Sequence, residues 1–263
     1  MEWIAGLVAV VASLGGGVGY AVDQAALNFL RSQLDEADVL EVRVESQPNY
    51  RLLDGQIDRI LVAGRGLQRD PFPRIEVLEV ETDPVALNLG SLSGGQVTLA
   101  QPLQAALRLS ITSADLNAAL SAPELLAQFQ NIEADLPLLG SPDGQPQRFN
   151  LRDPEIVFLP DQRIQLSAQL IQLLPSGEAP AVEVTFTAGI EVDDGQALRL
   201  RQPEFTIGSV PVPQEIAGAF LGGLNEIINL ADLESQGLLV RILQLNVTPD
   251  NLELVGFVRL ESL

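Results

Sequence analysis

The sequence lacks histidine, cysteine and lysine, so the 15 basic residues among its 263 are all arginines. Without cysteine there can be no disulfide, no thiolate nucleophile and no cysteine-bound metal or cluster. Without histidine the chain loses the usual general base, the serine–histidine triads and the commonest metal ligand. Without lysine it can form neither a Schiff base nor a P-loop. These absences argue against most classes of enzyme, and we expect no catalytic residue, metal or cofactor.

Aromatic side chains and positive charge are also scarce. Aromatic residues make up 5% of the chain although hydrophobic residues make up 46%, so we expect an aliphatic interior. The net charge of −20 leaves no basic stripe for a nucleic-acid partner. It also disfavours adsorption to anionic lipid headgroups. Any attachment to a membrane is therefore expected to be hydrophobic.

The longest uncharged run lies at the N-terminus, at residues 3–22. About 20 apolar residues suffice to cross a bilayer as a helix. Trp3 and Tyr20 stand near the two ends of the run, where interfacial aromatics occur. A cleaved signal peptide would require a basic residue before the run, and the sequence has none there. A buried core helix is the alternative. We interpret residues 1–22 as a membrane anchor or uncleaved signal, continued by an amphipathic helix at 23–34.

Residues 103–130 best indicate the architecture. Apolar residues alternate with polar ones over 103–111, which predicts a strand with one buried face. Thr112 and Ser113 then offer hydroxyl caps for a helix. A second start signal at residues 121–124, with serine followed by proline and glutamate, predicts that this helix is broken. The apolar side of the helix must be buried against another element.

The same order of elements recurs in the second half. Residues 182–192 give the longest clean alternation in the chain, and residues 214–233 predict a long helix with a wide apolar stripe. Gly218, Gly222 and Gly223 leave space beside this stripe, which favours the lining of a cavity over ordinary packing on the sheet. We interpret the chain as a loose duplication of one α+β unit.

Short motifs along the chain resemble those of one known family. The run Ser110-Ile-Thr-Ser-Ala-Asp115-Leu-Asn117-Ala-Ala-Leu120 is similar to the strand-then-helix signature of the LmeA-type phospholipid-binding family, whose members are exported or membrane-anchored. Leu53-Asp-Gly55, Thr82-Asp-Pro84 and the closing Leu252-x-Leu-x-Gly256 strand fit as well. The resemblance covers roughly residues 25–263.

The resemblance implies an α+β fold in which a long, curved antiparallel sheet wraps around helices as two loosely repeated halves. It also implies an apolar tunnel for acyl chains, and it brings no catalytic residues to transfer. We expect a lipid-binding domain at residues 23–263, with halves at 23–137 and 148–263. We expect this domain to be membrane-anchored and to face the periplasm or another extracytoplasmic space.

The expected partner is a phospholipid or another acyl lipid, such as a glycolipid, which the protein binds and, as a further step, transfers. Eight apolar residues are expected to line the tunnel: Leu116, Leu120, Phe129, Phe186, Ile190, Phe220, Leu224 and Ile227. Two other functions stay open. One is a structural or scaffold envelope protein with a fully packed core, and the other is an accessory subunit of an envelope glycosyltransferase. Protein partners stay unknown from the sequence.

Three groups of polar residues could carry chemistry, and each has a structural interpretation that we favour. Asp115 and Asn117 could meet a lipid headgroup, but such residues more often cap a helix and hydrogen-bond a neighbouring loop. Asp193 and Asp194, before Gly195, lack the further oxygen ligands of a calcium site, so we predict a hairpin turn. The remaining carboxylates show no spacing that singles out the two acids of a glycosidase.

Overall fold

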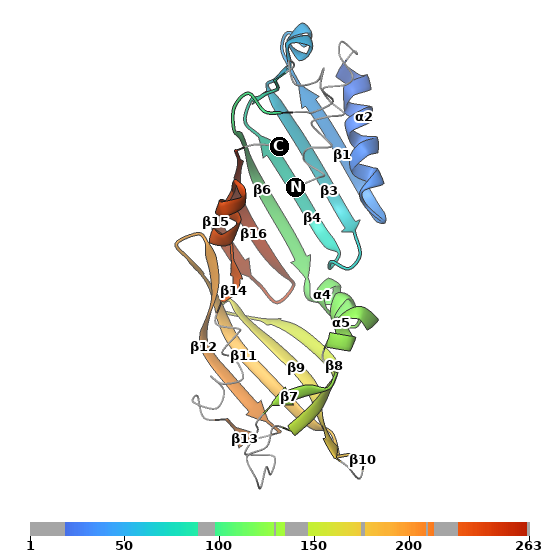
Figure 1. Cartoon of the computed structure of the whole chain (residues 1–263), viewed down its shortest axis with the longest axis vertical. Helices are drawn as coiled ribbons and strands as arrows, with labels where there is room; N and C mark the ends of the chain where they lie inside the picture. The colour runs from blue at the N-terminus through green and yellow to red at the C-terminus, as the bar shows by residue number, and fades with distance from the viewer. Residues whose placement is uncertain are drawn as a thin grey trace.

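The computed structural model describes residues 19–88, 98–128, 130–134, 147–174, 177–208, 210–212 and 226–261. In these residues the chain forms two open antiparallel sheets, which lie end to end along the long axis of an elongated molecule (Figure 1). The predicted antiparallel sheet structure is therefore confirmed, although the strands form two open sheets instead of one and the described residues contain few helices. The wrapping of the sheet around helices, the two repeated halves and the apolar tunnel stay predictions.

The first sheet holds six strands and combines the two ends of the chain. Its order is β1 (Glu36–Glu45), β3 (Arg59–Gln68), β4 (Ile75–Thr82), β6 (Leu103–Thr112), β16 (Asn251–Leu260) and β15 (Leu238–Val247). β6 pairs with β16 along its whole length, with Leu103 opposite Leu260. The C-terminal hairpin thus completes a sheet begun by the N-terminal strands. The pair of β6 and β16 joins the two predicted halves, residues 23–137 and 148–263. The division into these halves stays a prediction.

The second sheet is a meander built on four long strands. These are β8 (Gln147–Leu159), β9 (Arg163–Leu174), β11 (Val182–Asp193) and β12 (Ala197–Ile207). Short strands extend it: β7 (Ile132–Ala134), β10 (Gly177–Glu178), β13 (Val210–Pro211) and β14 (Glu226–Asn229). Asp194 and Gly195 adopt positive φ angles of 47° and 70° in the turn between β11 and β12. Aspartate and glycine tolerate this region, and the predicted hairpin is confirmed.

The broken helix predicted after β6 is confirmed as α4 (Ser113–Leu120) and α5 (Pro123–Gln128). Thr112 is the N-cap of α4: its hydroxyl oxygen accepts a hydrogen bond from the Asp115 backbone N–H at 3.1 Å. The Asp115 carboxylate in turn accepts one from the Thr112 N–H at 3.3 Å. This reciprocal capping box pairs N–H groups that the start of a helix leaves free. α4 and α5 lie where the two sheets meet (Figure 1).

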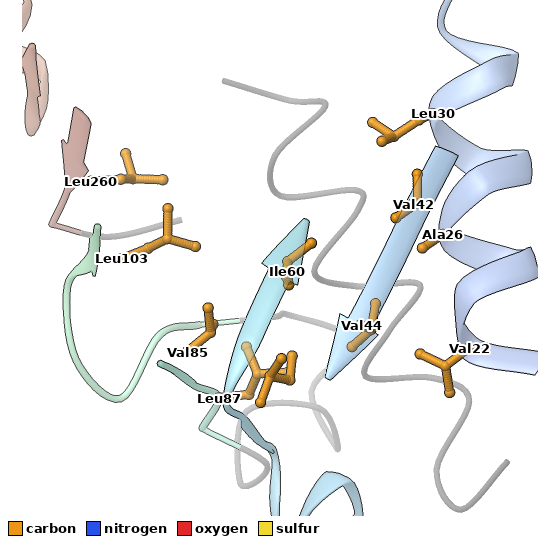
Figure 2. Close-up of a cluster of buried hydrophobic side chains, with 11 residues drawn as sticks. Val22, Ala26, Leu30, Val42, Val44, Ile60, Val85, Leu87, Leu103 and Leu260 are labelled. Atoms are coloured by element: carbon orange, nitrogen blue, oxygen red, sulfur yellow. The ribbon is translucent and has the colours of Figure 1, made fainter. Parts of the chain in front are cut away.

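The helix predicted at residues 23–34 is confirmed as α2 (Gly19–Ser32), which covers β1. Val22, Ala26 and Leu30 recur at helical spacing, and each is at most 7% exposed. Figure 2 shows them facing Val42 and Val44 of β1. Two small strands, β2 (Gln56–Ile57) and β5 (Val85–Ala86), and the 3-10 helix η1 (Asn49–Asp54) pack near the same end of the first sheet.

The predicted membrane span falls largely outside the described residues. Those residues include no helix that is both long enough and apolar enough to cross a membrane. Residues 3–18, with Trp3, are not described, and neither is the side chain of Tyr20 within α2. Val22, the last residue of the predicted span, is 2% exposed and packs in the core between α2 and β1. The anchor stays a prediction.

The long helix predicted for residues 214–233 is wrong where the structure describes it. Residues 226–229 form β14, which pairs antiparallel with β12, and η3 (Ala231–Gln236) is a short 3-10 helix. Ile227 and Ile228 are adjacent β-branched residues, which suit an extended strand. At residues 226–229, pairing with the edge strand β12 therefore determines the structure, although the spacing of the apolar residues favours a helix.

Three clusters of buried apolar side chains hold the fold together. The α2 cluster comprises Val22, Ala26, Leu30, Val42, Val44, Ile57, Ile60, Val85, Leu87, Leu103 and Leu260. The junction cluster lies between the sheets and comprises Phe158, Ile190, Leu198, Ile242, Leu245 and Val247. The second-sheet cluster comprises Phe149, Ala168, Leu170, Val184, Phe186, Ala188, Ile207 and Val212. Only Phe149, Phe158 and Phe186 among the buried members of these clusters are aromatic, so the described interior is mainly aliphatic, as predicted.

Candidate functional site

One face of the first sheet is apolar over most of its width. Residues directly opposite each other on neighbouring strands point to the same face. One such row across the sheet is Val42, Val62, Val80 and Leu107, and the next row is Leu40, Gly64, Leu78, Leu109 and Leu254. Eight of these nine residues are apolar and bear a side chain, so the face is a continuous hydrocarbon surface.

This face is packed at its ends and incompletely covered in its middle. The α2 cluster closes one end, and the junction cluster, against which Leu254 packs, closes the other. Next to the α2 cluster and between it and the junction cluster lie six half-buried side chains, which we call the apolar strip: Leu40, Val62, Leu78, Val80, Leu107 and Leu109. Leu40 and Val62 pack against the α2 cluster. Large aliphatic side chains in a packed core are usually buried completely. The strip therefore retains apolar surface that a ligand could cover.

A groove of about 740 Å³ crosses the same strands. Its lining takes three consecutive residues from each of four strands, 41–43, 61–63, 79–81 and 106–108, together with Leu40 and Val255. Asp23, Gln24 and Leu27 of α2 line one end. Because neighbouring strands lie about 4.8 Å apart, the five strands from β1 to β16 span about 19 Å. The volume falls within the range of about 300–1,000 Å³ that is usual for small-molecule sites.

Polar contacts fix the borders of this groove. The Asp23 carboxylate accepts a hydrogen bond of 2.7 Å from the Val44 N–H, which secures α2 to the outer edge of β1. The opposite face of the first sheet carries charged side chains. There Arg108 forms ion pairs with Glu79 at 3.4 Å and with Glu253 at 2.7 Å. The hydrogen bond from Arg108 holds the pKa of Glu253 below its ordinary value, although desolvation acts in the opposite direction. Arg43 is exposed and forms no ion pair with the residues that the structure describes.

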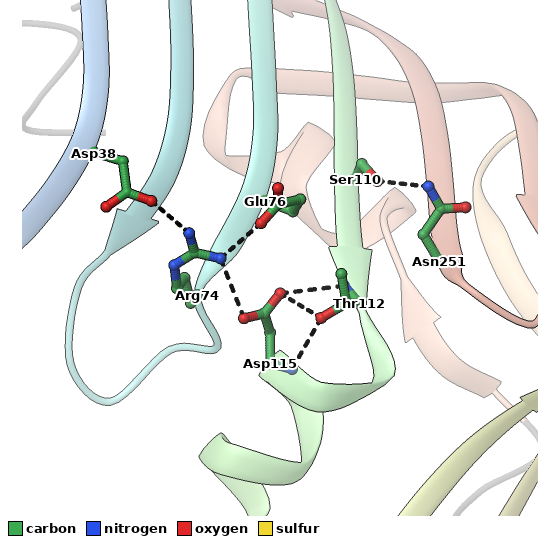
Figure 3. A network of polar contacts seen from close by, with 7 residues as sticks. All are labelled: Asp38, Arg74, Glu76, Ser110, Thr112, Asp115 and Asn251. Carbon is green, nitrogen blue, oxygen red and sulfur yellow. Dashed lines mark hydrogen bonds and ion pairs between the residues drawn. The ribbon is translucent and has the colours of Figure 1, made fainter.

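A second polar network joins the first sheet to α4 (Figure 3). The Arg74 guanidinium contacts Asp38 and Glu76, each at 2.6 Å, and Asp115 at 3.4 Å. Hydrogen bonds to Glu76 and then Asp38 raise the pKa of Arg74 above its ordinary value. Asp115 therefore both caps α4 and joins the turn before β4 to that helix. The structural interpretation of Asp115 is confirmed.

A second cavity, which we call the junction cleft, lies between the second sheet and β15. It has a volume of about 740 Å³ and is lined by Asp161, Gln162, Arg163, Gly189, Ile190, Glu191, Val192, Arg201, Gln202, Leu243, Gln244 and Leu245. Gln244 is the cross-strand partner of Val255, which belongs to the groove. The linings of the two cavities thus meet across the pair of β15 and β16, on the face opposite the apolar strip, because Val255 also pairs with Arg108.

The structure brings together only part of the residue set predicted to line a tunnel. Leu116 of α4 packs against the junction cluster, which contains Ile190, whereas Phe186 belongs to the second-sheet cluster. Leu200 packs against both of these clusters and so connects them. Leu120 is half-buried in the last turn of α4.

The other predicted lining residues are not placed. Phe129, Phe220 and Leu224 lie outside the described residues. Ile227 lies in β14, and its side chain is not described. The proposed roles of all eight residues stay predictions.

The apolar strip and the junction cleft were not predicted as sites. Alternation along β1, β4 and β6 does identify the apolar face of each strand, and Leu107 and Leu109 stand within such an alternation. What alternation does not reveal is which part of a face other elements leave uncovered. Among the described residues, no group of three or more acidic side chains is placed to hold a metal ion.

The sequence profile of the LmeA-like phospholipid-binding family matches residues 12–257, which is nearly the whole chain. The resemblance indicated by the motifs of β6, α4 and β16 is thereby confirmed. No curated protein matches the chain. No solved structure matches it either.

Proposed function

Because the chain belongs to the LmeA-like phospholipid-binding family, we propose that it binds the acyl chains of a phospholipid or glycolipid along the apolar strip. Binding of this kind needs no catalytic group. The protein covers the hydrocarbon chain and releases it unchanged.

The single observation that supports this site is the half-buried state of six aliphatic side chains on the face that the α2 cluster and the junction cluster close at its ends, although Leu40 and Val62 pack against the α2 cluster. A hydrocarbon chain laid on them would remove its own surface and theirs from water. Each buried methylene contributes about 0.8 kcal/mol. About ten methylenes would therefore contribute about 8 kcal/mol, before the cost of ordering the lipid is subtracted.

We propose that the predicted tunnel follows a path of apolar side chains beyond the strip. Leu254 connects the strip to the junction cluster, and Leu200 connects that cluster to the second-sheet cluster. Leu116, Ile190 and Phe186 lie along this path. A path from one sheet to the other would let a lipid move along the protein, which is the basis on which we propose passive transfer.

We further propose that the protein acts at a membrane of the cell envelope, on its extracytoplasmic side, and that residues 1–22 hold it there. The support is the uncharged run at residues 3–22. Membrane fractionation of the full chain beside a chain lacking residues 2–18 tests the anchor. Recovery of both chains in the soluble fraction would contradict it.

The lipid site is tested by mass spectrometry of lipids that accompany the protein through purification without detergent. Val80→Gln places a polar group on the strip and should reduce the bound lipid. Val77→Gln is a matched control, because Val77 is a half-buried valine of the same strand that points to the opposite face. Equal lipid content in the two variants would contradict the site. A wild-type protein that carries no lipid would favour the scaffold alternative.

A further inference from the structure

Two carboxylates stand on the face of the apolar strip, at its end nearest α4. Strand residues two positions apart point to the same face of a sheet. Asp38 of β1 therefore shares the face of Leu40, and Glu76 of β4 shares the face of Leu78. Leu40 and Leu78 belong to one row of the strip. The backbones of Asp38 and Glu76 thus lie about 7 Å beyond that row.

The guanidinium of Arg74 joins these two carboxylates (Figure 3). It contacts Asp38 and Glu76 at 2.6 Å each and Asp115 of α4 at 3.4 Å, and we call these four residues the Arg74 cluster. Gly66 of β3 lies beneath the cluster, since a β-carbon at this position would collide with the Asp38 carboxylate and the Arg74 guanidinium. The glycine therefore leaves room for charged groups on a face that is otherwise apolar.

The same row is apolar on the next two strands, β6 and β16. Val77 pairs with Ser110, so the preceding Glu76 comes next to Ile111 in the row. Ile111 in turn pairs with Leu252, which packs against the junction cluster. The charged end of the strip is thus confined to β1, β3 and β4. A lipid on the strip could place its headgroup there without entering the apolar path to the second sheet.

Within the part of the chain that the structure describes, three members of the Arg74 cluster have hydrogen-bonding capacity to spare. A guanidinium has five N–H donors, and the contacts of Arg74 use three. Asp38 and Glu76 each accept one of these bonds, although a carboxylate has room for about four, and their side chains are 58% and 43% exposed. Asp115 differs, because it is 12% exposed and also bonds to Thr112 as part of the cap of α4.

We propose that the Arg74 cluster binds the zwitterionic headgroup of a phospholipid, a phosphoethanolamine, while the acyl chains of the same lipid lie on the apolar strip. The phosphate accepts hydrogen bonds from the Arg74 guanidinium, and the ammonium donates to the carboxylates of Asp38 and Glu76. One guanidinium among three carboxylates leaves two negative charges in excess. The ammonium offsets this excess, whereas a headgroup with a net negative charge is repelled. The proposal rests on acyl-chain binding at the strip, and it names the headgroup that accompanies the chains.

The test is calorimetry on the full chain with two lipids that share the same chains, dihexanoyl phosphatidylethanolamine and dihexanoyl phosphatidylglycerol. Wild type should bind the phosphatidylethanolamine about tenfold more tightly, the effect of one hydrogen bond to a charged group. Glu76→Gln and Asp38→Asn each keep an acceptor for Arg74 and remove a negative charge, so each should reduce this preference severalfold. Glu45→Gln is the matched control and should leave the preference unchanged. Glu45 also accepts a hydrogen bond from an arginine, Arg59, at 2.7 Å, but it points to the opposite face of the sheet.

A second pair of variants tests the phosphate contact. Arg74→Gln removes the guanidinium, so it should weaken both lipids about tenfold, because both carry a phosphate. Arg59→Gln is the control, since Arg59 likewise joins two carboxylates, those of Glu45 and Glu81, but on the opposite face. It should leave both affinities unchanged.

Three results would overturn the headgroup assignment: equal or reversed affinity of wild type for the two lipids, an unchanged preference in Glu76→Gln and Asp38→Asn, or unchanged affinities in Arg74→Gln. Val80→Gln separates this assignment from acyl-chain binding, because it alters the strip alone and should weaken both lipids alike. If both lipids bind equally well and Val80→Gln weakens both, only the headgroup assignment fails. If neither lipid binds to wild type, acyl-chain binding at the strip fails as well.

Discussion

Asn117 of α4 and Ile156 of β8 are joined by two hydrogen bonds that imitate one rung of a β-ladder. The Asn117 Nδ2 donates to the Ile156 carbonyl at 2.9 Å, and the Ile156 N–H donates to the Asn117 Oδ1 at 2.6 Å. A carboxamide carries the same donor and acceptor as a peptide group. The Asn117 side chain therefore pairs with the backbone of β8 as a neighbouring strand would. It also joins α4, the helix that follows the last residue of β6, to the second sheet. The structural interpretation of Asn117 is confirmed.

Replacing Asn117 by leucine should destabilise the protein by about 1–3 kcal/mol, because the N–H and carbonyl of Ile156 lose both partners in a partly buried place. Urea unfolding measures the free energy, and amide exchange of Ile156 should accelerate. Asn28→Leu is the control, since Asn28 is exposed on α2, and it should change stability by less than about 0.5 kcal/mol. Equal effects of the two changes would show that the Asn117 contact carries no stability.

Local chemistry explains why parts of the fold were predictable. Alternation over residues 103–111 and 182–192 identified β6 and β11, since the period of a strand is a property of a few neighbouring residues. Thr112 and Pro123 marked the starts of α4 and α5, because a cap acts within one turn. These signals lie within the segment that they describe.

The pairing of distant segments explains the rest. The apolar strip exists because β6 pairs with β4 on one side and β16 on the other, and Arg108 meets Glu253 from 145 positions away in the sequence. Nothing within β6 specifies those neighbours. The junction cleft likewise depends on β15 lying beside the second sheet. At residues 226–229 a sheet edge decided the structure, and local helical spacing gave the wrong result.

The cap of α4 gives a second prediction, since the sequence offered both Thr112 and Ser113 and the structure assigns Thr112. Thr112→Val removes the hydroxyl that pairs with the Asp115 N–H and should cost about 0.5–2 kcal/mol of stability. Ser113→Ala is the control, because Ser113 is the first helical residue and should be nearly neutral. Chemical unfolding compares the two variants. A larger loss of stability from Ser113→Ala than from Thr112→Val would show that Thr112 is not the residue that caps α4.

The Arg108–Glu253 contact predicts a pH dependence of stability. The folded state holds the pKa of Glu253 below its ordinary value, so the pair stabilises the fold above the unfolded pKa of about 4.3. That stability is lost as the pH falls through the lower, folded pKa. Wild type should therefore exceed Glu253→Gln in stability at pH 7. The difference should shrink as the pH falls below about 4.3 and disappear below the folded pKa of Glu253.

Unfolding in urea at several pH values between 7 and 3 measures this difference. Glu183→Gln is a suitable control, because Glu183 is exposed on β11 and has no ion pair among the described residues. Its difference from wild type should stay small and vary little with pH. A difference for Glu253→Gln that grows as the pH falls would contradict the direction assigned to its pKa.

The apolar strip also predicts how affinity depends on the length of the ligand. Each methylene that the strip covers contributes about 0.8 kcal/mol, which corresponds to about a fourfold gain in affinity. Calorimetry with a series of saturated fatty acids should therefore show a steady gain per carbon, followed by a plateau once the chain fills the groove between α2 and β16. Val80→Gln should lower the gain per carbon, and Val77→Gln should reproduce the wild-type series. Affinity that does not change with chain length would mean that the protein holds lipids by their headgroups and leaves the strip uncovered.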